Sequence, residues 1–341
     1  EALAEIYRND DNWSGVIDLE AQEAEHTEDP NEQADLYHHA AETVLDHFEH
    51  DSARATQLYE KAIAAVEDHI PSARALADLY FINEEWAKSA GLLDLLVNRL
   101  DPVGHRDELC VQHYRLAYIS EKLGDDEKAL EHYLASHDVE ESYLPTLEGL
   151  AAALMRAERW EDARHTFQTI LDFHQESLTD AEVVDLHFQL GELQTRLGDA
   201  RLARRSFDRA LELDPNHPGA LQAYALLCEE LNEWEDAYDH RARLLPMLDE
   251  QERFGEVKRQ AELCRDRILD PYRAIDAYSE ARRLRPDDEG ALEALAGLYK
   301  ETSQAAKGIE TLEELAKALK DPDRRRDVNL ELAGLHYVGE R

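Results

Sequence analysis

The sequence has 341 residues, more than one compact core usually holds, so we expect several domains or an elongated array. Hydrophobic residues make up 43% of the chain, whereas glycine and proline number only 14 and 10, which favours an all-α protein over a loop-rich or β-rich one. The formal net charge of −39 would repel nucleic-acid phosphates and anionic membranes, so we expect neither as a partner.

Two sequence motifs alternate along the chain. The first contains the four tryptophans, which are spaced 73 or 74 residues apart: Trp13, Trp86, Trp160 and Trp234. The second contains a recurring aspartate before an apolar pattern: Asp51, Asp125, Asp199 and Asp270. A fixed period of this size is the signature of a repeat protein. Because four copies of a tryptophan suit stacking better than a single site, we expect these rings to be mostly buried at the start of a helix.

The larger period divides into two units of about 34 residues plus a short polar insertion. In each unit apolar residues recur at three and four positions, which predicts two helices. The insertions at 27–32, 101–108, 177–182, 248–254 and 321–327 are interpreted as spacers at helix boundaries. We expect one continuous array over 1–341 with these units: 1–30 (partial), 36–69, 70–103, 110–143, 144–177, 184–217, 218–251, 255–288, 289–322 and 327–341 (partial).

Segment 184–217 resembles the tetratricopeptide repeat. The matching residues are small or large at the positions that the repeat requires: Leu190, Gly191, Gly198, Ala203, Phe207, Ala210 and Pro215. The resemblance extends over nearly the whole chain and is closest to a fragment of a bacterial-type tandem array. It implies an all-α, right-handed α-solenoid of tandem antiparallel helix pairs. Since one pair cannot bury its apolar face alone, neighbouring pairs must stack.

The resemblance also implies a concave groove lined by the first helix of each unit. Carried over position by position, the groove residues expected to contact a partner are Arg74, Phe81, Tyr114, Tyr118, Lys122, Arg156, Phe188 and Arg196. Aromatic and arginine side chains are the usual anchors of protein interfaces. The same positions carry nearly balanced charge, unlike the chain as a whole, so the groove should repel a partner less than the exterior does.

The function expected from these features is a non-catalytic scaffold that binds a peptide or a partner helix in the groove. The alternative is a regulatory segment of a larger multidomain enzyme whose catalytic domain lies outside this fragment. Self-association through the ends is a further prediction, because neither end shows the polar cap that a solenoid needs. The residue set that holds a carboxylate in chaperone-binding members of the family is not found at matching positions.

The sequence offers little chemistry. It contains no phosphate-binding glycine loop, zinc-protease motif or nucleophile elbow, so we expect no enzyme activity and no cofactor. His47 and His50 could share a helix face and hold a metal, but a solvated helix end is favoured; the adjacent His38 and His39 should diverge. Three widely spaced cysteines suggest buried thiols, and with no visible signal peptide or membrane segment they favour the cytoplasm: Cys110, Cys228 and Cys264.

Overall fold

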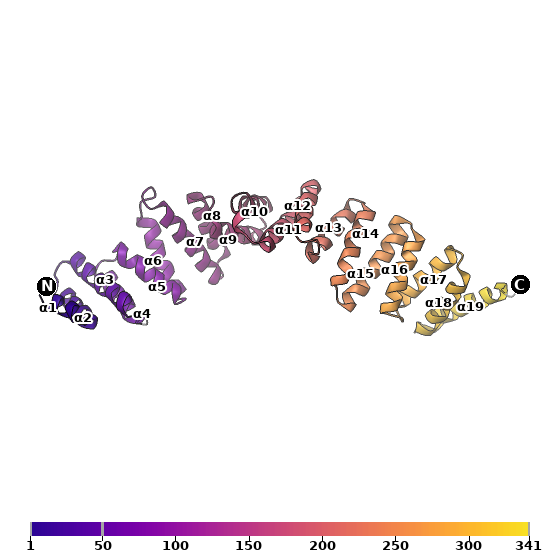
Figure 1. The fold of residues 1–341 in the computed structure, drawn as a ribbon, viewed down its shortest axis with the longest axis horizontal. Helices are drawn as coiled ribbons and strands as arrows, with labels where there is room; N and C mark the ends of the chain where they lie inside the picture. Colours follow the sequence, from indigo (N-terminus) through magenta and orange to yellow (C-terminus); the bar gives the residue numbers. More distant parts are fainter. Residues whose placement is uncertain (1, 49–50, 340–341) are drawn as a thin grey trace. The chain divides into compact units, whose positions relative to one another are not determined.

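The computed structural model describes residues 2–48 and 51–339. Within these ranges the chain forms nineteen α-helices, joined by short turns, and no β-strand (Figure 1). The chain divides into two compact units, Glu1–Glu176 and Ser177–Arg341. None of the described helices has both the length and the apolar character needed to cross a bilayer. The fold is therefore all-α, as predicted; the repeat boundaries and the single continuous array stay predictions.

Unit 1 contains ten α-helices that pack against one another in chain order. They are α1 (Ala2–Asn9), α2 (Trp13–His26), α3 (Pro30–His47), α4 (Ser52–Ala65), α5 (Ile70–Ile82), α6 (Trp86–Arg99), α7 (Arg106–Lys122), α8 (Asp126–Val139), α9 (Leu144–Arg156) and α10 (Trp160–His174). From α3 onward, the strongest packing joins each odd-numbered helix to the even-numbered helix that follows it, as in α3 with α4 and α7 with α8. The unit is thus a series of helix pairs.

Unit 2 continues the same pattern with nine α-helices. They are α11 (Asp180–Arg196), α12 (Ala200–Leu213), α13 (Pro218–Glu230), α14 (Trp234–Leu244), α15 (Glu250–Leu263), α16 (Pro271–Leu284), α17 (Glu289–Glu301), α18 (Ala305–Ala318) and α19 (Pro322–Gly339). Short 3-10 turns lie at Gln175–Ser177 and Leu245–Met247, and a π-helix spans Cys264–Ile268. In both units the even-numbered helix is the second member of its pair.

The turn inside each helix pair has one conformation. The residue before the N-cap of the second helix has a positive φ in every pair whose turn the structure describes: Asp11, Glu84, Gly124, Glu158, Gly198, Asn232, Leu269 and Ser303. Only two of these residues are glycines, although the left-handed region costs other residues about 1–2 kcal/mol. The turn geometry is therefore imposed by packing of the two helices and not by local sequence preference.

The recurring aspartates of the sequence lie at the N-caps of second helices. The Asp51 carboxylate accepts a hydrogen bond from the Arg54 amide, Asp125 from Lys128, and Asp270 from Tyr272 and Arg273. These bonds satisfy amide groups that have no partner within the helix. Asp199 occupies the same position before α12 but makes no such side-chain bond. The motif with the recurring aspartate thus marks the start of the second helix in a pair.

The core repeats through two positions of the second helix. Its fourth residue is small and buried in all but the first pair: Ala55, Ser89, Ala129, Ala163, Ala203, Ala237, Ala274 and Gly308. Its eighth residue is usually a buried aromatic ring: Tyr59, Tyr133, Phe167, Phe207 and Tyr278. A methyl group added at Gly191 on α11 would lie 2.6 Å from the Phe207 ring. Small residues therefore let the helices approach, and the ring fills the remaining space.

The four tryptophans begin α2, α6, α10 and α14, as predicted, and each is more than half buried, in agreement with the expectation of mostly buried rings. Trp86 and Trp234 pack against the hydrophobic cores of their units. Trp13 stacks on His47 with ring centroids 3.7 Å apart, and the Arg267 guanidinium lies 5.3 Å from the Trp234 ring centroid.

Two irregularities distinguish unit 2. The eighth residue of α14 is Arg241, whose side chain is completely buried and forms ion pairs with Glu229 and Glu256. The π-helix Cys264–Ile268 changes the helical register before α16. Within α15, before the π-helix, Ala261 is buried and Glu262 is exposed.

Gly198 and Gly255 are both exposed, but only Gly198 has a positive φ. Substituting each glycine therefore tests how much the conformation of the turn affects stability. We expect Gly198→Ala to lower the free energy of unfolding by about 1 kcal/mol, because Gly198 has φ of +79° and open space around it. Gly255→Ala, within α15 and also in open space, should raise it by about 0.5–1 kcal/mol through helix propensity. Urea denaturation measures both changes, and equal signs would contradict the proposed role of the turn.

A second prediction concerns the buried imidazole of His113. Burial, and to a lesser degree the neighbouring His132, lowers the pKa of His113 below its usual value near 6.5. The unfolded chain therefore binds more protons below that pH, so unit 1 should lose stability as the pH falls through 6.5. His113→Gln should lessen this loss in urea titrations at pH 7 and pH 5.5. An unchanged pH dependence in the variant would show that His113 is not responsible.

Candidate functional site

The predicted groove residues of unit 1 lie on three first helices. Arg74 and Phe81 lie on α5, Tyr114, Tyr118 and Lys122 on α7, and Arg156 ends α9. Of these, Phe81 and Tyr118 meet directly, with ring centroids 5.8 Å apart. Tyr114 lies one helical turn before Tyr118, so the two tyrosines share a face of α7.

Aromatic residues from the ends of neighbouring helices enlarge this contact. Trp86, the first residue of α6, lies 5.5 Å from Phe81 and 6.0 Å from Tyr118, both centroid to centroid and edge-on. Tyr143, the N-cap residue of α9, lies 6.0 Å from Tyr114 in the same manner. We call Phe81, Trp86, Tyr114, Tyr118 and Tyr143 the aromatic face.

The aromatic face lines a shallow hollow of about 610 Å³. All five rings are partly exposed, and they share the hollow with Ile82, Glu84, Val111 and Arg115. The Ile82 side chain is 74% exposed, which is unusual for a large apolar residue. A cluster of accessible aromatic and aliphatic groups of this kind is suited to bind an apolar or cationic group of another molecule.

Two cationic side chains of the chain itself lie over rings of the aromatic face. The Arg115 guanidinium lies 5.4 Å from the Phe81 centroid and pairs with Asp78, while the Lys122 ammonium lies 4.9 Å from the Tyr118 centroid. Burial raises the pKa of Tyr114 and that of Tyr143, so both phenols are neutral at physiological pH. The rings therefore already accept cations in a cation–π arrangement.

The two arginines predicted for the groove in unit 1 do not join the aromatic face. Arg74 donates two hydrogen bonds to Glu108, at 2.6 and 2.9 Å. Arg156 pairs with Glu121 and with Asp126, the latter at 3.0 Å from its Nε. Both guanidiniums are thus partly exposed and already have carboxylate partners within the chain.

The predicted residues of unit 2 have different surroundings. The Phe188 ring on α11 packs against His217, with centroids 5.2 Å apart, and contacts the backbone at Gly219. Arg196 is exposed at the last residue of α11. Phe188 is thus partly used in packing one pair against the next.

Sequence reasoning missed Trp86, Tyr143, Ile82 and Arg115 as lining residues. Trp86 was assigned to packing because it belongs to the tryptophan period, and Tyr143 lies at the edge of a predicted unit. The available signal was the concentration of aromatic residues at helix ends next to the predicted groove positions. Periodicity alone does not reveal this concentration of aromatic residues, because the rings come from different positions of the repeat.

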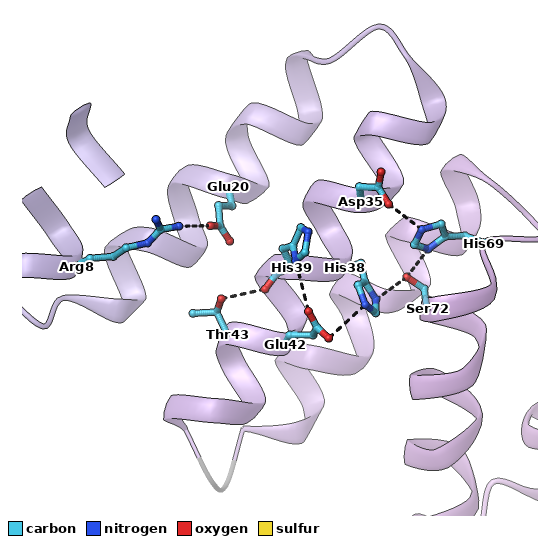
Figure 2. Close-up of polar contacts among 9 residues, drawn as sticks. All are labelled: Arg8, Glu20, Asp35, His38, His39, Glu42, Thr43, His69 and Ser72. Atoms are coloured by element: carbon cyan, nitrogen blue, oxygen red, sulfur yellow. Dashed lines mark hydrogen bonds and ion pairs between the residues drawn. The ribbon is translucent and has the colours of Figure 1, made fainter. Parts of the chain in front are cut away.

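A polar network in the first pairs resembles a catalytic arrangement (Figure 2). His69 faces Asp35 through Nε2 at 3.1 Å and Ser72 Oγ through Nδ1 at 2.8 Å, and His38 Nδ1 lies 3.1 Å from the same hydroxyl. Ser72 is completely buried, so no substrate reaches its hydroxyl in this conformation. Burial also lowers the pKa of His38. The network therefore ties α3 to the start of α5.

Two further clusters contain residue types that can bind metals: the histidines of α3 and the group around Cys228. His38 and His39 both approach Glu42, at 3.4 Å, so the adjacent histidines converge on one carboxylate and do not diverge as expected (Figure 2). His50, predicted beside His47, lies outside the described residues. Near Cys228, Glu233 and Asp236 approach closely, but Arg204 pairs with both carboxylates.

Burial raises the pKa of the Cys228 thiol to about 12, so it stays protonated near neutral pH. A protonated thiol is a poor metal ligand, and the Arg204 guanidinium already supplies the positive charge that the two carboxylates need. Like Cys228, the other two cysteines are buried: Cys110 and Cys264.

Comparison with known proteins identifies one sequence family. Residues 142–216 match the tetratricopeptide repeat model. The C-terminal part of a TPR repeat-containing protein from Cytophaga hutchinsonii is 15% identical, with a TM-score of 0.48 over 75% of this chain and 98% of that one. A tetratricopeptide repeat protein from Parabacteroides merdae is 13% identical, with a TM-score of 0.42 over 76% and 96%. No curated protein matches the sequence.

A third solved structure is that of YrrB, a TPR protein described as having an unusual peptide-binding site. It is 16% identical, with a TM-score of 0.43 over 56% of this chain and 91% of that one. The family match spans α9 to α12, and the same small fourth residue and bulky eighth residue recur in second helices of both units. Residues 142–216 are therefore identified as tetratricopeptide repeats, and the helix-pair pattern of this segment recurs among the other described helices.

Proposed function

We propose that this chain is a non-catalytic scaffold whose aromatic face binds a peptide segment of a partner protein. Tetratricopeptide arrays are generally protein-interaction modules. The observation that carries the proposal is the group of five partly exposed rings, Phe81, Trp86, Tyr114, Tyr118 and Tyr143, around one hollow. Aromatic side chains supply most of the energy at protein interfaces because they bury a large area with few rotatable bonds.

The partner segment should carry positive charge. The chain has a net charge of −39, and the Glu84 carboxylate lines the hollow beside the rings. Lys122 and Arg115 already lie over Tyr118 and Phe81, which shows that these rings accept cations in this setting. Arginine and lysine side chains of a partner would gain both ring contacts and long-range attraction.

An extended segment fits the site better than a folded domain. The hollow is open and shallow, and its rings come from four helices: α5, α6, α7 and the N-cap of α9. An extended peptide can place successive side chains on successive rings and needs no complementary globular surface. Exposed Ile82 adds an apolar contact beside the rings.

A peptide selection followed by mutagenesis tests this proposal. We expect random peptides displayed on phage and selected on the chain to be enriched in arginine, lysine and apolar residues. Phe81→Ala combined with Tyr118→Ala should weaken binding of a selected synthetic peptide by roughly tenfold or more in calorimetry, because it removes two adjacent anchors. Phe188→Ala, a partly buried ring of unit 2, is the matched control and should leave the affinity unchanged.

Arg156→Ala gives a further control, since its guanidinium is held by Glu121 and Asp126. We expect at most a small change in peptide affinity from this substitution. Binding that survives the double aromatic substitution but is lost in Phe188→Ala or Arg156→Ala would refute the aromatic face as the site.

Salt dependence tests the charge of the partner separately. The affinity of a selected peptide should fall as sodium chloride rises from roughly 50 mM to 500 mM, because salt screens attraction between exposed charges. An affinity that stays constant or rises with salt would show that binding is apolar and that the acidic surface does not select the partner.

A further inference from the structure

An apolar hollow of unit 2 lies among α17, α18 and α19. Its volume is about 470 Å³. We call it the α17–α19 pocket, and its lining residues are Glu293, Ala296, Gly297, Lys300, Ser303, Ala305, Gly308, Leu312, Leu315, Val328, Glu331 and Leu335. Pockets of this size with mostly apolar walls and a few polar groups are typical of small-molecule sites. The aromatic face lies in unit 1, so the two sites are separate features.

The pocket exists because three positions of this helix pair carry small side chains. The eighth residue of the second helix is Phe207 in α12 and Tyr278 in α16, but only Leu312 in α18. The fourth residue of α18 is Gly308, where most other second helices have alanine. The ring that fills the core at this position of α12 and α16 is therefore missing in α18.

The glycines show directly how much space is left. A Cβ built at Gly297 meets no atom within 4 Å, and one built at Gly308 meets only Tyr299 Cβ, at 3.5 Å. By contrast, a Cβ at Gly191 would collide with Phe207 at 2.6 Å. Gly297 and Gly308 are therefore not needed for close packing of these helices, and they leave the wall of the pocket open.

Polar groups lie at the rim and are already paired. The Lys300 ammonium lies 2.7 Å from a Glu331 carboxylate oxygen and so links α17 to α19. Glu293 pairs with Arg324 at 2.8 Å. The lining residues include two carboxylates and one ammonium, so the pocket carries a net negative charge, as does the whole chain at −39. An anionic ligand would meet repulsion, whereas an uncharged one would leave both ion pairs intact.

We propose that the α17–α19 pocket binds an uncharged apolar molecule of two or three aromatic rings. The ring would lie against Leu312, Leu315 and Val328, in the space that an aromatic side chain fills in other pairs. Removing that apolar surface and the surface of the ligand from water supplies the binding free energy. The walls are already formed by packed helices, so the ligand does not have to open the structure.

Two fluorescent probes with the same rings and different charge test the ligand class. N-Phenylnaphthylamine is uncharged, and anilinonaphthalene sulfonate carries the same rings plus one negative charge. We expect saturable binding of one uncharged probe per chain, and binding of the sulfonate that is roughly tenfold weaker or more. Equal affinity for both probes, or no saturable binding of the uncharged one, would overturn the proposal.

A matched pair of glycine substitutions locates the site. Gly297→Leu places a side chain into the pocket, whereas Gly255→Leu places the same side chain on an exposed face of α15 with nothing within 4 Å of its Cβ. We expect the first to reduce probe affinity by roughly tenfold or more and the second to leave it unchanged. Circular dichroism establishes that both variants are folded.

A second variant fills the pocket by enlarging the side chain of a lining residue on α18. Leu312→Phe restores the aromatic residue that other second helices have at this position, and it should also displace the probe. Unchanged probe binding in both Gly297→Leu and Leu312→Phe would show that the probe binds elsewhere, and the proposed site would be wrong.

Discussion

The contact between the two helices of each pair is the constraint on which the structure depends. A small fourth residue of the second helix lets the first helix approach, and a bulky eighth residue fills the remaining space, as Ala203 and Phe207 do in α12. This contact fixes the turn as well. Six described residues other than glycine accept a positive φ, including Glu84 and Glu158, because the packed helices leave the chain no other path.

Changes at the eighth position alter the chemistry of the core without altering the fold. Arg241 replaces the ring in α14, where its buried charge requires both Glu229 and Glu256 as partners. Taking a guanidinium out of water costs several kcal/mol, and only close carboxylates offset that cost. Leu312 replaces the ring in α18, and there the missing volume stays as the α17–α19 pocket. One repeat position thus yields a filled core, a buried ion network or a cavity.

The tryptophan period and the proposed binding site are connected through helix ends. The first residue of a second helix lies at the edge of the core, and the neighbours of the tryptophan there differ between copies. Trp13 stacks on His47, and Arg267 lies over Trp234, whereas Trp86 meets Phe81 and Tyr118. Residues that recur for folding are therefore available for binding where the adjacent helices supply further rings. The repeat provides the scaffold, and variation between its copies provides the specificity.

The sequence by itself determined the all-α fold, the helix pairs and the start of most second helices, because small, large and capping residues recur at fixed spacing. It also pointed to Phe81, Tyr114 and Tyr118 as candidate binding residues, because aromatic residues at first-helix positions are visible when the repeats are aligned with one another. Only the tertiary structure decided that Arg74 and Arg156 are held in ion pairs, that Trp86 and Tyr143 join the aromatic face, and that Gly297 and Gly308 leave a pocket. These outcomes depend on distances between side chains of different repeats, which the spacing within one repeat does not specify.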